Sequence, residues 1–423
     1  MLTGDGAGSG ATFGAASAGG GGVTSAAGGL AAIDADGLRA QVAEFLAAHD
    51  PRTSDPAEFL RARFDTGLAW VHYPAGLGGQ GLPRSLQTVV DREFEAAGSP
   101  TNHPERNGIG LGMAAPTILA HGTQDQKERW LRPLWTGEEI WCQLFSEPGA
   151  GSDLAGLATR AVRDGDVWTA NGQKVWTSVA HIASRALLVA RTNPDVPKHE
   201  GLTYFALDMT QPGVEVRPLR QISGEAEFNE VFLTDARIPD ADRIGEVGQG
   251  WTVSMATLMN ERVSIGGGAM PREGGMIASA ARTWRQHPEL RTPGLHDRML
   301  RLWADSEVAR ISASRLRQQL AAGQPGPEGS AAKLVFARLN QEISEFEVEL
   351  NGADGLRYDD WTMRRPQGAN FFGRNPGFRF LRAKGNSIEG GTSEILRNIV
   401  SERVLGLPKE ARADTGPWKD LPR

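Results

Sequence analysis

The chain has 423 residues, of which 40% are hydrophobic and 23% charged, so it can form two or three domains with sizeable cores. Its net charge of -6 is not the positive charge of proteins that bind nucleic acids or anionic membranes. No apolar run approaches the ~20 residues of a membrane span. A single cysteine, Cys142, excludes an intrachain disulfide framework, and the eight histidines are scattered without a metal-binding pair. We therefore expect a cytoplasmic protein without a metal site, a nucleic-acid partner or a membrane partner.

Residues 1–32 consist mostly of glycine, alanine, serine and threonine. They have neither the basic and apolar regions of a secretory signal nor the Arg-rich pattern of a transit peptide. The glycines of residues 4–10 lack the G-x-G-x-x-G spacing of a dinucleotide-binding loop. This composition predicts a flexible tail.

Residues 33–138 predict an N-terminal helical domain. Apolar residues at helical spacing begin at Leu38, after the capping candidates Asp34 and Asp36. Glycine and proline in residues 70–81 indicate a loop. Further helices are expected over residues 56–66, 85–97, 113–121 and 123–135.

Residues 139–246 change to a strand pattern and predict a small antiparallel barrel or sandwich. Asn171-Gly172 lies between two short β-like runs, which is typical of a hairpin turn. Further strands are expected over residues 185–191, 202–209, 214–218 and 231–238.

Residues 247–408 are helical again, and residues 409–423 are expected to form a C-terminal tail. Long helices are predicted over residues 251–266, 298–320 and 331–350, with apolar stripes typical of a core or a subunit interface. The fold class is therefore mainly α with a central β domain.

Three stretches combine glycine, hydroxyl and aromatic residues. Residues 141–153 read Trp-Cys-Gln-Leu-Phe-Ser-Glu-Pro-Gly-Ala-Gly-Ser-Asp, an apolar segment that ends in a loop whose glycines let a large ligand approach the backbone. Residues 171–178 read Asn-Gly-Gln-Lys-Val-Trp-Thr-Ser, and residues 389–398 read Glu-Gly-Gly-Thr-Ser-Glu-Ile-Leu-Arg-Asn. In this order the stretches resemble the signatures of the acyl-CoA dehydrogenase family, flavoenzymes that desaturate acyl-CoA thioesters. The resemblance covers roughly residues 35–408.

The resemblance implies a fold and a set of partners. The fold is an N-terminal helical domain, a small β domain and a C-terminal four-helix bundle. FAD is the implied cofactor, acyl-CoA the substrate and an electron-transfer flavoprotein the electron acceptor. The implied assembly is a homotetramer or homodimer, with a heteromer left open. The Gly-Gly-Thr-Ser-Glu-Ile form is similar to a bacterial branch that includes enzymes of branched, aromatic or steroid side-chain acids.

The resemblance also implies which residues contact FAD. A hydroxyl at Ser146 faces the flavin ring and Ser152 meets the pyrophosphate. Trp176 covers the ring, with the Ser178 hydroxyl near its reactive nitrogen. Taken singly, each serine would be interpreted as a capping or turn residue. The implied cofactor residues are Phe145, Ser146, Gly151, Ser152, Trp176, Ser178, Thr392 and Glu394.

Dehydrogenation requires a base for the Cα proton, a hydride acceptor at Cβ and donors for the thioester oxygen. Many family members place the glutamate base directly before Gly-Thr, where this chain has Gly390. Glu389 lies one residue earlier, and that offset directs the side chain elsewhere, so it is the less favoured base. Another branch has a Glu-Arg pair on the first helix after the β domain, which matches Glu261 and Arg262. We take Glu261 as the base and Arg262 as its support, although residue type alone would favour a surface ion pair.

Two alternatives remain open. The first is a flavin-dependent oxidase or monooxygenase of a biosynthetic pathway on the same scaffold. The second is a non-catalytic subunit of a heteromer, in which Gly390 marks a lost base. The family's arginine that reaches a neighbouring subunit's cofactor has no clean match, with Arg285 and Arg291 as candidates.

Overall fold

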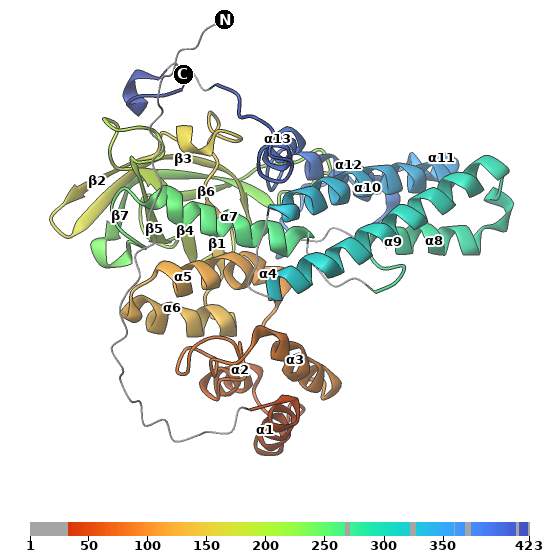
Figure 1. The fold of residues 1–423 in the computed structure, drawn as a ribbon, viewed down its shortest axis with the longest axis horizontal. Helices are drawn as coiled ribbons and strands as arrows, with labels where there is room; N and C mark the ends of the chain where they lie inside the picture. The colour runs from red at the N-terminus through yellow and green to blue at the C-terminus, as the bar shows by residue number, and fades with distance from the viewer. Residues whose placement is uncertain are drawn as a thin grey trace, which may run out of the picture.

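The computed structural model describes residues 33–266, 271–321, 327–358, 360–368, 374–411 and 414–421. A group of N-terminal helices, a central sheet and a set of long C-terminal helices lie side by side, and the long helices extend away from the sheet (Figure 1). This arrangement confirms the predicted fold class. The expected tail of residues 1–32 lies outside the described residues.

The N-terminal helices begin where local sequence signals place them. The Asp34 side chain accepts hydrogen bonds from the backbone N–H groups of Asp36 and Gly37 and caps the first helix. Thr123 and Gln126 form a reciprocal capping box at the start of α6. Each helix predicted in this region is present. The helices are α1 (Ala35–Ala48), α2 (Pro56–Asp65), α3 (Gln87–Ala96), α4 (Pro104–Ile109), α5 (Ala115–His121) and α6 (Gln124–Thr136).

The central sheet is mixed rather than purely antiparallel. Its strand order is β1-β4-β2-β3-β7-β6, with β5 paired to β4. Strand β1 runs parallel to β4, because β2 and β3 lie between them in the chain and provide the long crossover that parallel pairing needs. The strands are β1 (Trp141–Leu144), β2 (Arg160–Asp164), β3 (Val167–Ser178), β4 (Arg185–Arg191), β5 (Leu202–Asp208), β6 (Val214–Pro218) and β7 (Phe228–Pro239).

The predicted hairpin turn at Asn171-Gly172 is wrong. The turn between β2 and β3 lies at Gly165 and the residue after it, where Asp164 pairs with Val167. Gly172 lies inside β3 at an irregularity in the pairing with β7. A Cβ on Gly172 would lie 2.3 Å from the Thr159 Oγ1 atom, so the glycine permits a close approach of chains instead of a turn.

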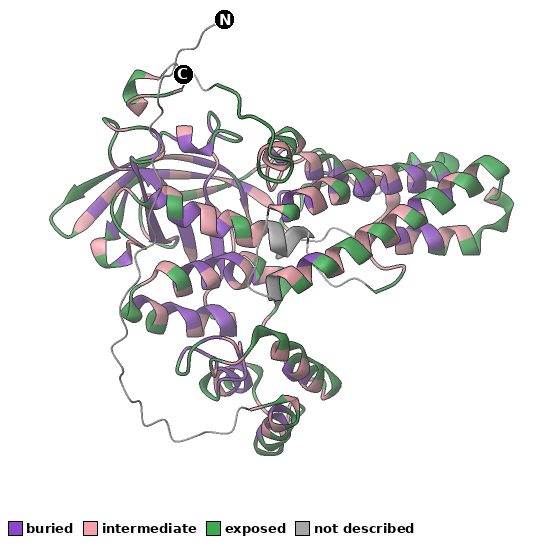
Figure 2. Ribbon diagram, viewed as in Figure 1, coloured by how far each residue is buried: buried purple, intermediate pink, exposed green. Residues whose placement is uncertain are grey.

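The C-terminal helices surround α10, which packs against α7, α8, α9, α12 and α13. Buried residues concentrate in the sheet and on the inner faces of these helices, while the outer faces of α8 and α9 are exposed (Figure 2). The three long helices predicted here are confirmed. The helices are α7 (Gly250–Gly266), α8 (Met276–Gln286), α9 (Pro293–Ala321), α10 (Glu328–Leu350), α11 (Gly352–Gly355), α12 (Pro376–Ala383) and α13 (Ser393–Arg403).

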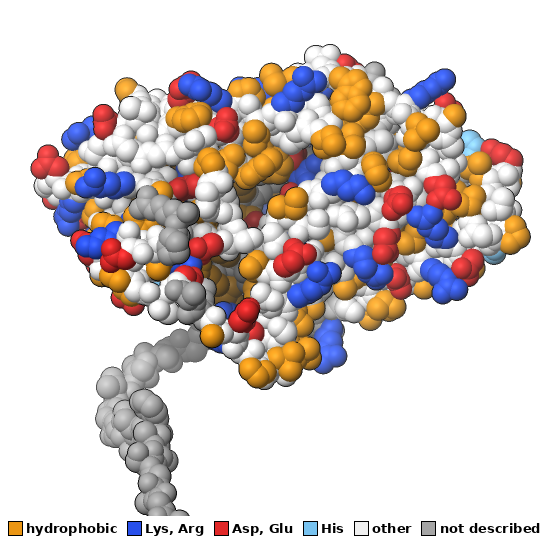
Figure 3. Space-filling view, turned by 90° about the horizontal axis from the view of Figure 1, so that it is seen from above, with side chains coloured by type: hydrophobic (Ala, Val, Ile, Leu, Met, Phe, Trp, Pro, Cys, Tyr) orange, Lys and Arg blue, Asp and Glu red, His pale blue; other side chains and the backbone are white. Residues whose placement is uncertain are grey.

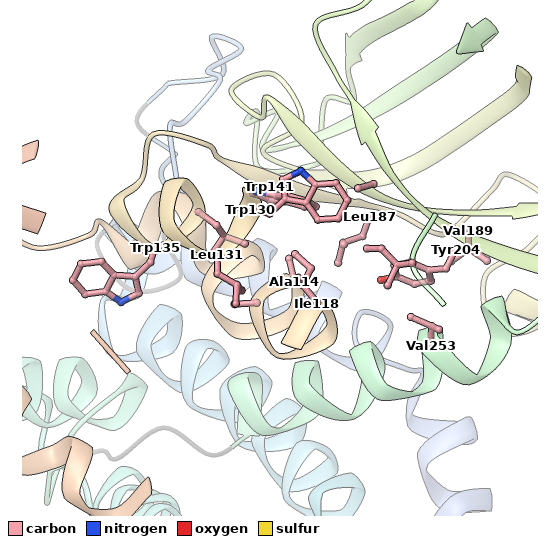
Figure 4. Close-up of a cluster of buried hydrophobic side chains, with 14 of the residues drawn as sticks. Ala114, Ile118, Trp130, Leu131, Trp135, Trp141, Leu187, Val189, Tyr204 and Val253 are labelled. Atoms are coloured by element: carbon pink, nitrogen blue, oxygen red, sulfur yellow. The ribbon is translucent and has the colours of Figure 1, made fainter. Parts of the chain in front are cut away.

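A core cluster joins the N-terminal helices to one face of the sheet (Figure 4). The rings of Trp130 on α6 and Trp141 on β1 meet edge to face at 5.7 Å between centroids. The Trp141 backbone N–H donates to the Asn107 Oδ1 atom at 3.0 Å, so the entry into β1 has no unsatisfied backbone donor. The first motif therefore begins on a rigid strand.

Three hydroxyl groups link α5, β5 and α7 inside this core. Thr257 Oγ1 lies 2.9 Å from Thr117 Oγ1 and 2.9 Å from the Tyr204 hydroxyl, and all three residues are fully buried. Thr257 lies one helical turn before Glu261 on α7. The network therefore fixes the helix that carries the proposed base.

We expect Thr257→Val to lower the free energy of unfolding by about 1–3 kcal/mol, because it leaves buried hydroxyl groups without a partner. Urea unfolding of the apoprotein measures this loss. Ser254→Ala is the matched control, since the Ser254 hydroxyl bonds only to the Gly250 carbonyl of its own helix. Equal losses in the two variants would contradict a linking role for Thr257.

Candidate functional site

A cavity of about 2210 Å³ lies between the β domain and the C-terminal helices. The molecule is visibly hollowed on one face (Figure 3). The cavity brings together residues from all three sequence motifs and from α7. Among its lining residues are Phe145, Ser146, Gly151, Ser152, Trp176, Ser178, Glu261, Glu389 and Thr392.

A buried ion pair joins the first two motifs. Lys174 on β3 is fully buried, and its Nζ lies 2.8 Å from the Glu147 Oε1 atom. The same Nζ donates to the Phe145 carbonyl, and the Glu147 carboxylate also accepts from the backbone N–H groups of Ala158 and Thr159. Burial alone would raise the pKa of Glu147, but the Lys174 charge and these hydrogen bonds lower it below its ordinary value. The pair therefore holds the glycine-rich loop against β3.

Trp176 has a strained backbone and an exposed ring at the cavity wall. Its φ is 60°, in the left-handed region, and it lies in a bulge between Lys174 and Thr177 in the pairing with β7. Its side chain is 58% exposed and meets the Phe228 ring edge to face at 5.8 Å. Backbone strain of this kind concentrates at ligand sites. An exposed indole on the cavity wall suits a planar ligand.

We expect the apoprotein of Trp176→Gly to be more stable than that of Trp176→Ala by about 1–2 kcal/mol, because only glycine adopts a left-handed φ without cost. Both variants lose the indole, so thermal unfolding of the apoproteins compares the backbone term alone. Equal stabilities would show that the backbone at this position relaxes when the ring is absent.

The glycine-rich loop of the first motif leaves open space beside its backbone. A Cβ added at Gly149 or Gly151 would meet nothing within 4 Å. The loop ends at Asp153, whose carboxylate accepts from the buried Lys198 Nζ at 2.7 and 2.8 Å. Backbone and hydroxyl donors at Ser152 are therefore presented to the cavity from an anchored loop.

The C-terminal motif forms a tight turn at the start of α13. Gly390 and Gly391 have φ values of 63° and 94°, which favour glycine. The Thr392 hydroxyl caps α13 by accepting from the Ile395 backbone N–H. The Lys333 Nζ donates to the Gly391 carbonyl at 2.8 Å and fixes the turn against α10. The N-terminus of α13 thus lies at the cavity wall.

Glu389 is held by neighbouring side chains of its own domain. Its two carboxylate oxygens each lie 3.0 Å from an Arg382 nitrogen, and one also accepts from Asn386 Nδ2 at 2.6 Å. Arg382 in turn pairs with Glu227, the residue before β7, 2.9 Å away. Burial opposes the charge of Arg382, but Glu389 and Glu227 raise its pKa above the ordinary value. A carboxylate clamped in this way is poorly suited to accept a substrate proton.

Glu261 lies on α7, is partly exposed, and lines the cavity. Arg262 lies on the same helix, but its side chain is outside the described residues. Charge from Glu261 acts on Lys333, whose pKa is lowered by burial against the opposing effects of Glu389 and Glu261. The proposed base therefore lies near Lys333, which fixes the C-terminal turn.

Three other sequence candidates lie away from the cavity wall. Glu394 is exposed on α13 and pairs with Arg397. Arg285 pairs with Glu273, and Arg291 donates to the Trp284 carbonyl. None of these three candidates is among the lining residues in this single chain.

Sequence reasoning assigned no role to Lys174, Lys198 or Arg382. Each is a buried cation with at least one carboxylate partner that is distant in sequence: Glu147 for Lys174, Asp153 for Lys198 and Glu227 for Arg382. Lys174 lies within a motif, which gave a signal that it is important without revealing its partner. Lys198 and Arg382 had no sequence signal.

The cavity wall fits the flavin dinucleotide that the motifs imply. An exposed indole, an open glycine-rich loop and a helix N-terminus face the same space, and these features suit a planar ring and a pyrophosphate. Within the described ranges no group of three or more histidine, cysteine or acidic residues forms a metal site. No helix in the described part of the chain is both long and apolar enough to cross a membrane.

Family models match almost the whole described chain. The acyl-CoA dehydrogenase N-terminal domain matches residues 34–138, the middle domain residues 142–236 and the C-terminal domain residues 248–405. These three matches follow the order of the helical, β and helical parts of the structure.

Two mycobacterial proteins and one solved structure show the same likeness. Acyl-CoA dehydrogenase FadE34 of Mycobacterium tuberculosis is 38% identical over 88% of this chain, which spans 49% of that relative's length. Acyl-CoA dehydrogenase IpdE1 of the same organism is 38% identical over 82% of this chain and 86% of its own length. The solved Tcur3481-Tcur3483 steroid ACAD superposes with a TM-score of 0.68 at 25% identity, covering 89% of this chain and 98% of the other.

Proposed function

Because the chain belongs to the acyl-CoA dehydrogenase family, whose members are FAD-dependent oxidoreductases, we propose that it desaturates an acyl-CoA thioester between Cα and Cβ. We assign the role of α-proton base to Glu261. The observation that carries this proposal is that a single cavity is lined by all three family motifs and by Glu261.

The side chains around the cavity have different roles in this reaction. Glu261 accepts the Cα proton, and a backbone N–H near Gly390 donates to the thioester oxygen as negative charge develops there. FAD, when bound, accepts the hydride that leaves Cβ. Trp176 and Ser178 would hold the ring of FAD, while the loop around Ser152 and the α13 N-terminus would hold its phosphate-bearing half. Glu389 keeps a structural role, because Arg382 and Asn386 occupy its carboxylate.

A substrate with a bulky, ring-bearing acyl group is the first class to test, since the solved relative is named as a steroid ACAD. We further propose an electron-transfer flavoprotein as the acceptor of the electrons. Both assignments rest on family likeness.

A second candidate is a subunit of a heteromeric enzyme. It is favoured by Gly390 at the position where many relatives have a glutamate, and by the solved relative whose designation joins two proteins. In this case the chain alone would hold flavin but would not complete the reaction. Co-expression with a homologous partner distinguishes the two candidates.

Anaerobic mixing of the purified protein with short, branched, aromatic and steroid acyl-CoA thioesters tests the function. Loss of the oxidised flavin absorbance with one thioester identifies a self-sufficient dehydrogenase and its substrate class. Flavin that stays oxidised with every thioester, but is reduced when a homologous partner chain is added, supports the heteromer instead. Hydrogen peroxide formed in air at the rate of substrate oxidation would overturn dehydrogenase action in favour of an oxidase.

A further inference from the structure

The end of the chain packs on the β domain. Residues 414–421 lie beside the connection between β4 and β5, where the C-terminal segment is drawn next to the sheet (Figure 1). The backbone N–H groups of Trp418 and Lys419 donate to the carbonyls of Val196 and Pro194 at 2.9 and 3.1 Å. We call residues 414–421 the C-terminal strap.

Trp418 is the main anchor of the strap. Its Nε1 donates to the Gly156 carbonyl at 3.2 Å, and the Arg191 guanidinium lies 4.2 Å from its ring centroid. Arg191 is buried and donates to the carbonyls of Ala155 and Leu157 at 2.6 and 3.1 Å. The strap therefore covers the segment that directly follows the glycine-rich loop.

A shared lysine links the strap to that loop. Lys198, whose side chain is 5% exposed, pairs with Asp153 at the end of the loop and with Asp414 at the start of the strap. Both carboxylates compensate the one buried charge of Lys198. Without the Asp414 carboxylate, the ion pair between Lys198 and Asp153 would remain. Asp153 lines the cavity together with Ser152.

The chain between α13 and the strap runs along the cavity. Lys409, Glu410 and Ala411 are among the lining residues. These three residues lie in the chain between α13, which ends at Arg403, and the strap, which begins at Asp414. A ligand beside the glycine-rich loop is therefore bordered by residues that come shortly before the strap in the chain.

We propose that the C-terminal strap retains FAD, with Trp418 and Asp414 acting as positioning residues for the glycine-rich loop and for residues 409–411. Release of the strap frees the cavity border and loosens the loop that faces the pyrophosphate. The proposal rests on FAD binding in this cavity and does not depend on the identity of the acyl substrate or of the base.

The dissociation rate of FAD from the holoenzyme tests this proposal. Release is followed by the recovery of free FAD fluorescence after dilution, without any acyl-CoA. We expect about a tenfold faster release for Trp418→Ala, since loss of about 1.4 kcal/mol corresponds to a factor of ten. Asp414→Asn should give a smaller increase, and a chain ending at Pro408 the largest. Lys419→Ala is the control, because its pair with Asp195 is exposed and contributes little.

The apoproteins separate cofactor retention from a merely structural role. Retention predicts that Trp418→Ala lowers the melting temperature of the holoenzyme more than that of the apoprotein. It also predicts that a synthetic peptide of residues 405–423 slows FAD release from the truncated chain. A release rate within twofold of the parent in both Trp418→Ala and the truncated chain would overturn the proposal. Equal shifts of the melting temperature with and without FAD would overturn it as well.

Discussion

Glu261→Gln is expected to reduce the rate constant of flavin reduction by a factor of about 10²–10⁴, the usual contribution of a general base. Glutamine keeps the size of the side chain and most of its hydrogen-bonding capacity, but it cannot accept the Cα proton. Because the change acts on the chemical step, the affinity for the thioester should change little. Anaerobic single-turnover mixing with a thioester that bleaches the parent flavin measures both quantities.

Two further variants make this experiment decisive. Glu342→Gln is the matched control, because Glu342 is partly exposed on α10, pairs with Arg338 and is not among the residues that line the cavity. Glu389→Gln should weaken the contacts of the C-terminal turn through Arg382, yet leave the pH dependence of flavin reduction unchanged. Parent-like flavin reduction by Glu261→Gln would rule out the assignment. Loss of the acidic limb of the pH profile in Glu389→Gln, where the rate falls as the base becomes protonated, would move the base to Glu389.

The helices of this protein were predictable because their signals are local. Capping residues such as Asp34 and Thr123 act within one turn, and the apolar spacing of α9 and α10 repeats every three or four residues. These features depend on neighbours in sequence, so they can be recognised before the fold is known. The bounds of these elements differ from the predicted ones by up to five residues, at the start of α9.

The hairpin error has a tertiary cause. Asn171-Gly172 is a strong local turn signal, but β3 continues through it to reach β7. Gly172 is required there because Thr159 lies against it, a contact between residues that are thirteen positions apart. Asn171 is held in the strand by a hydrogen bond from its Nδ2 to Asp235 at 3.0 Å. Tertiary contacts thus overrode the local preference.

The site was predictable in its residues but not in its supports. Motif residues such as Ser152 and Trp176 lie in short, recognisable strings, so a family resemblance could assign them. The pair of Arg382 with Glu227 and the strap at Trp418 depend on contacts between distant segments. Sequence alone does not show which of the 45 lysines and arginines pairs with which of the 51 aspartates and glutamates. Only the fold selects Arg382 for Glu389 and Glu227.

The largest expected loss of stability is that of Lys174→Met, which should lower the free energy of unfolding by about 3–5 kcal/mol. The substitution leaves the Glu147 carboxylate buried without its cation, and water cannot compensate it because the pair is enclosed. Urea unfolding of the apoprotein measures the loss. Lys419→Met is the matched control, since its ion pair is exposed to solvent and should contribute little to stability.

A double variant shows whether the loss comes from the uncompensated charge. Lys174→Met combined with Glu147→Leu removes both charges, so it should recover part of the stability that Lys174→Met loses. No recovery in the double variant would mean that the hydrogen bonds to the Phe145 carbonyl and to the Ala158 and Thr159 N–H groups matter more than the charge pair.

The pH dependence of the stability of these variants is an independent test of the charge pair. In the parent the pKa of Glu147 is lowered, so its stabilising effect is complete above the unfolded carboxyl pKa of about 4.3 and is lost as the pH falls through the lower folded value. Without Lys174, burial should raise the pKa of Glu147, and the buried charge is relieved when the carboxyl becomes protonated. The stability difference between parent and Lys174→Met should therefore be largest near pH 7 and should shrink as the pH falls toward 4. A difference that stays constant over this range would mean that the lysine stabilises the protein by packing, with its charge contributing nothing to the glycine-rich loop.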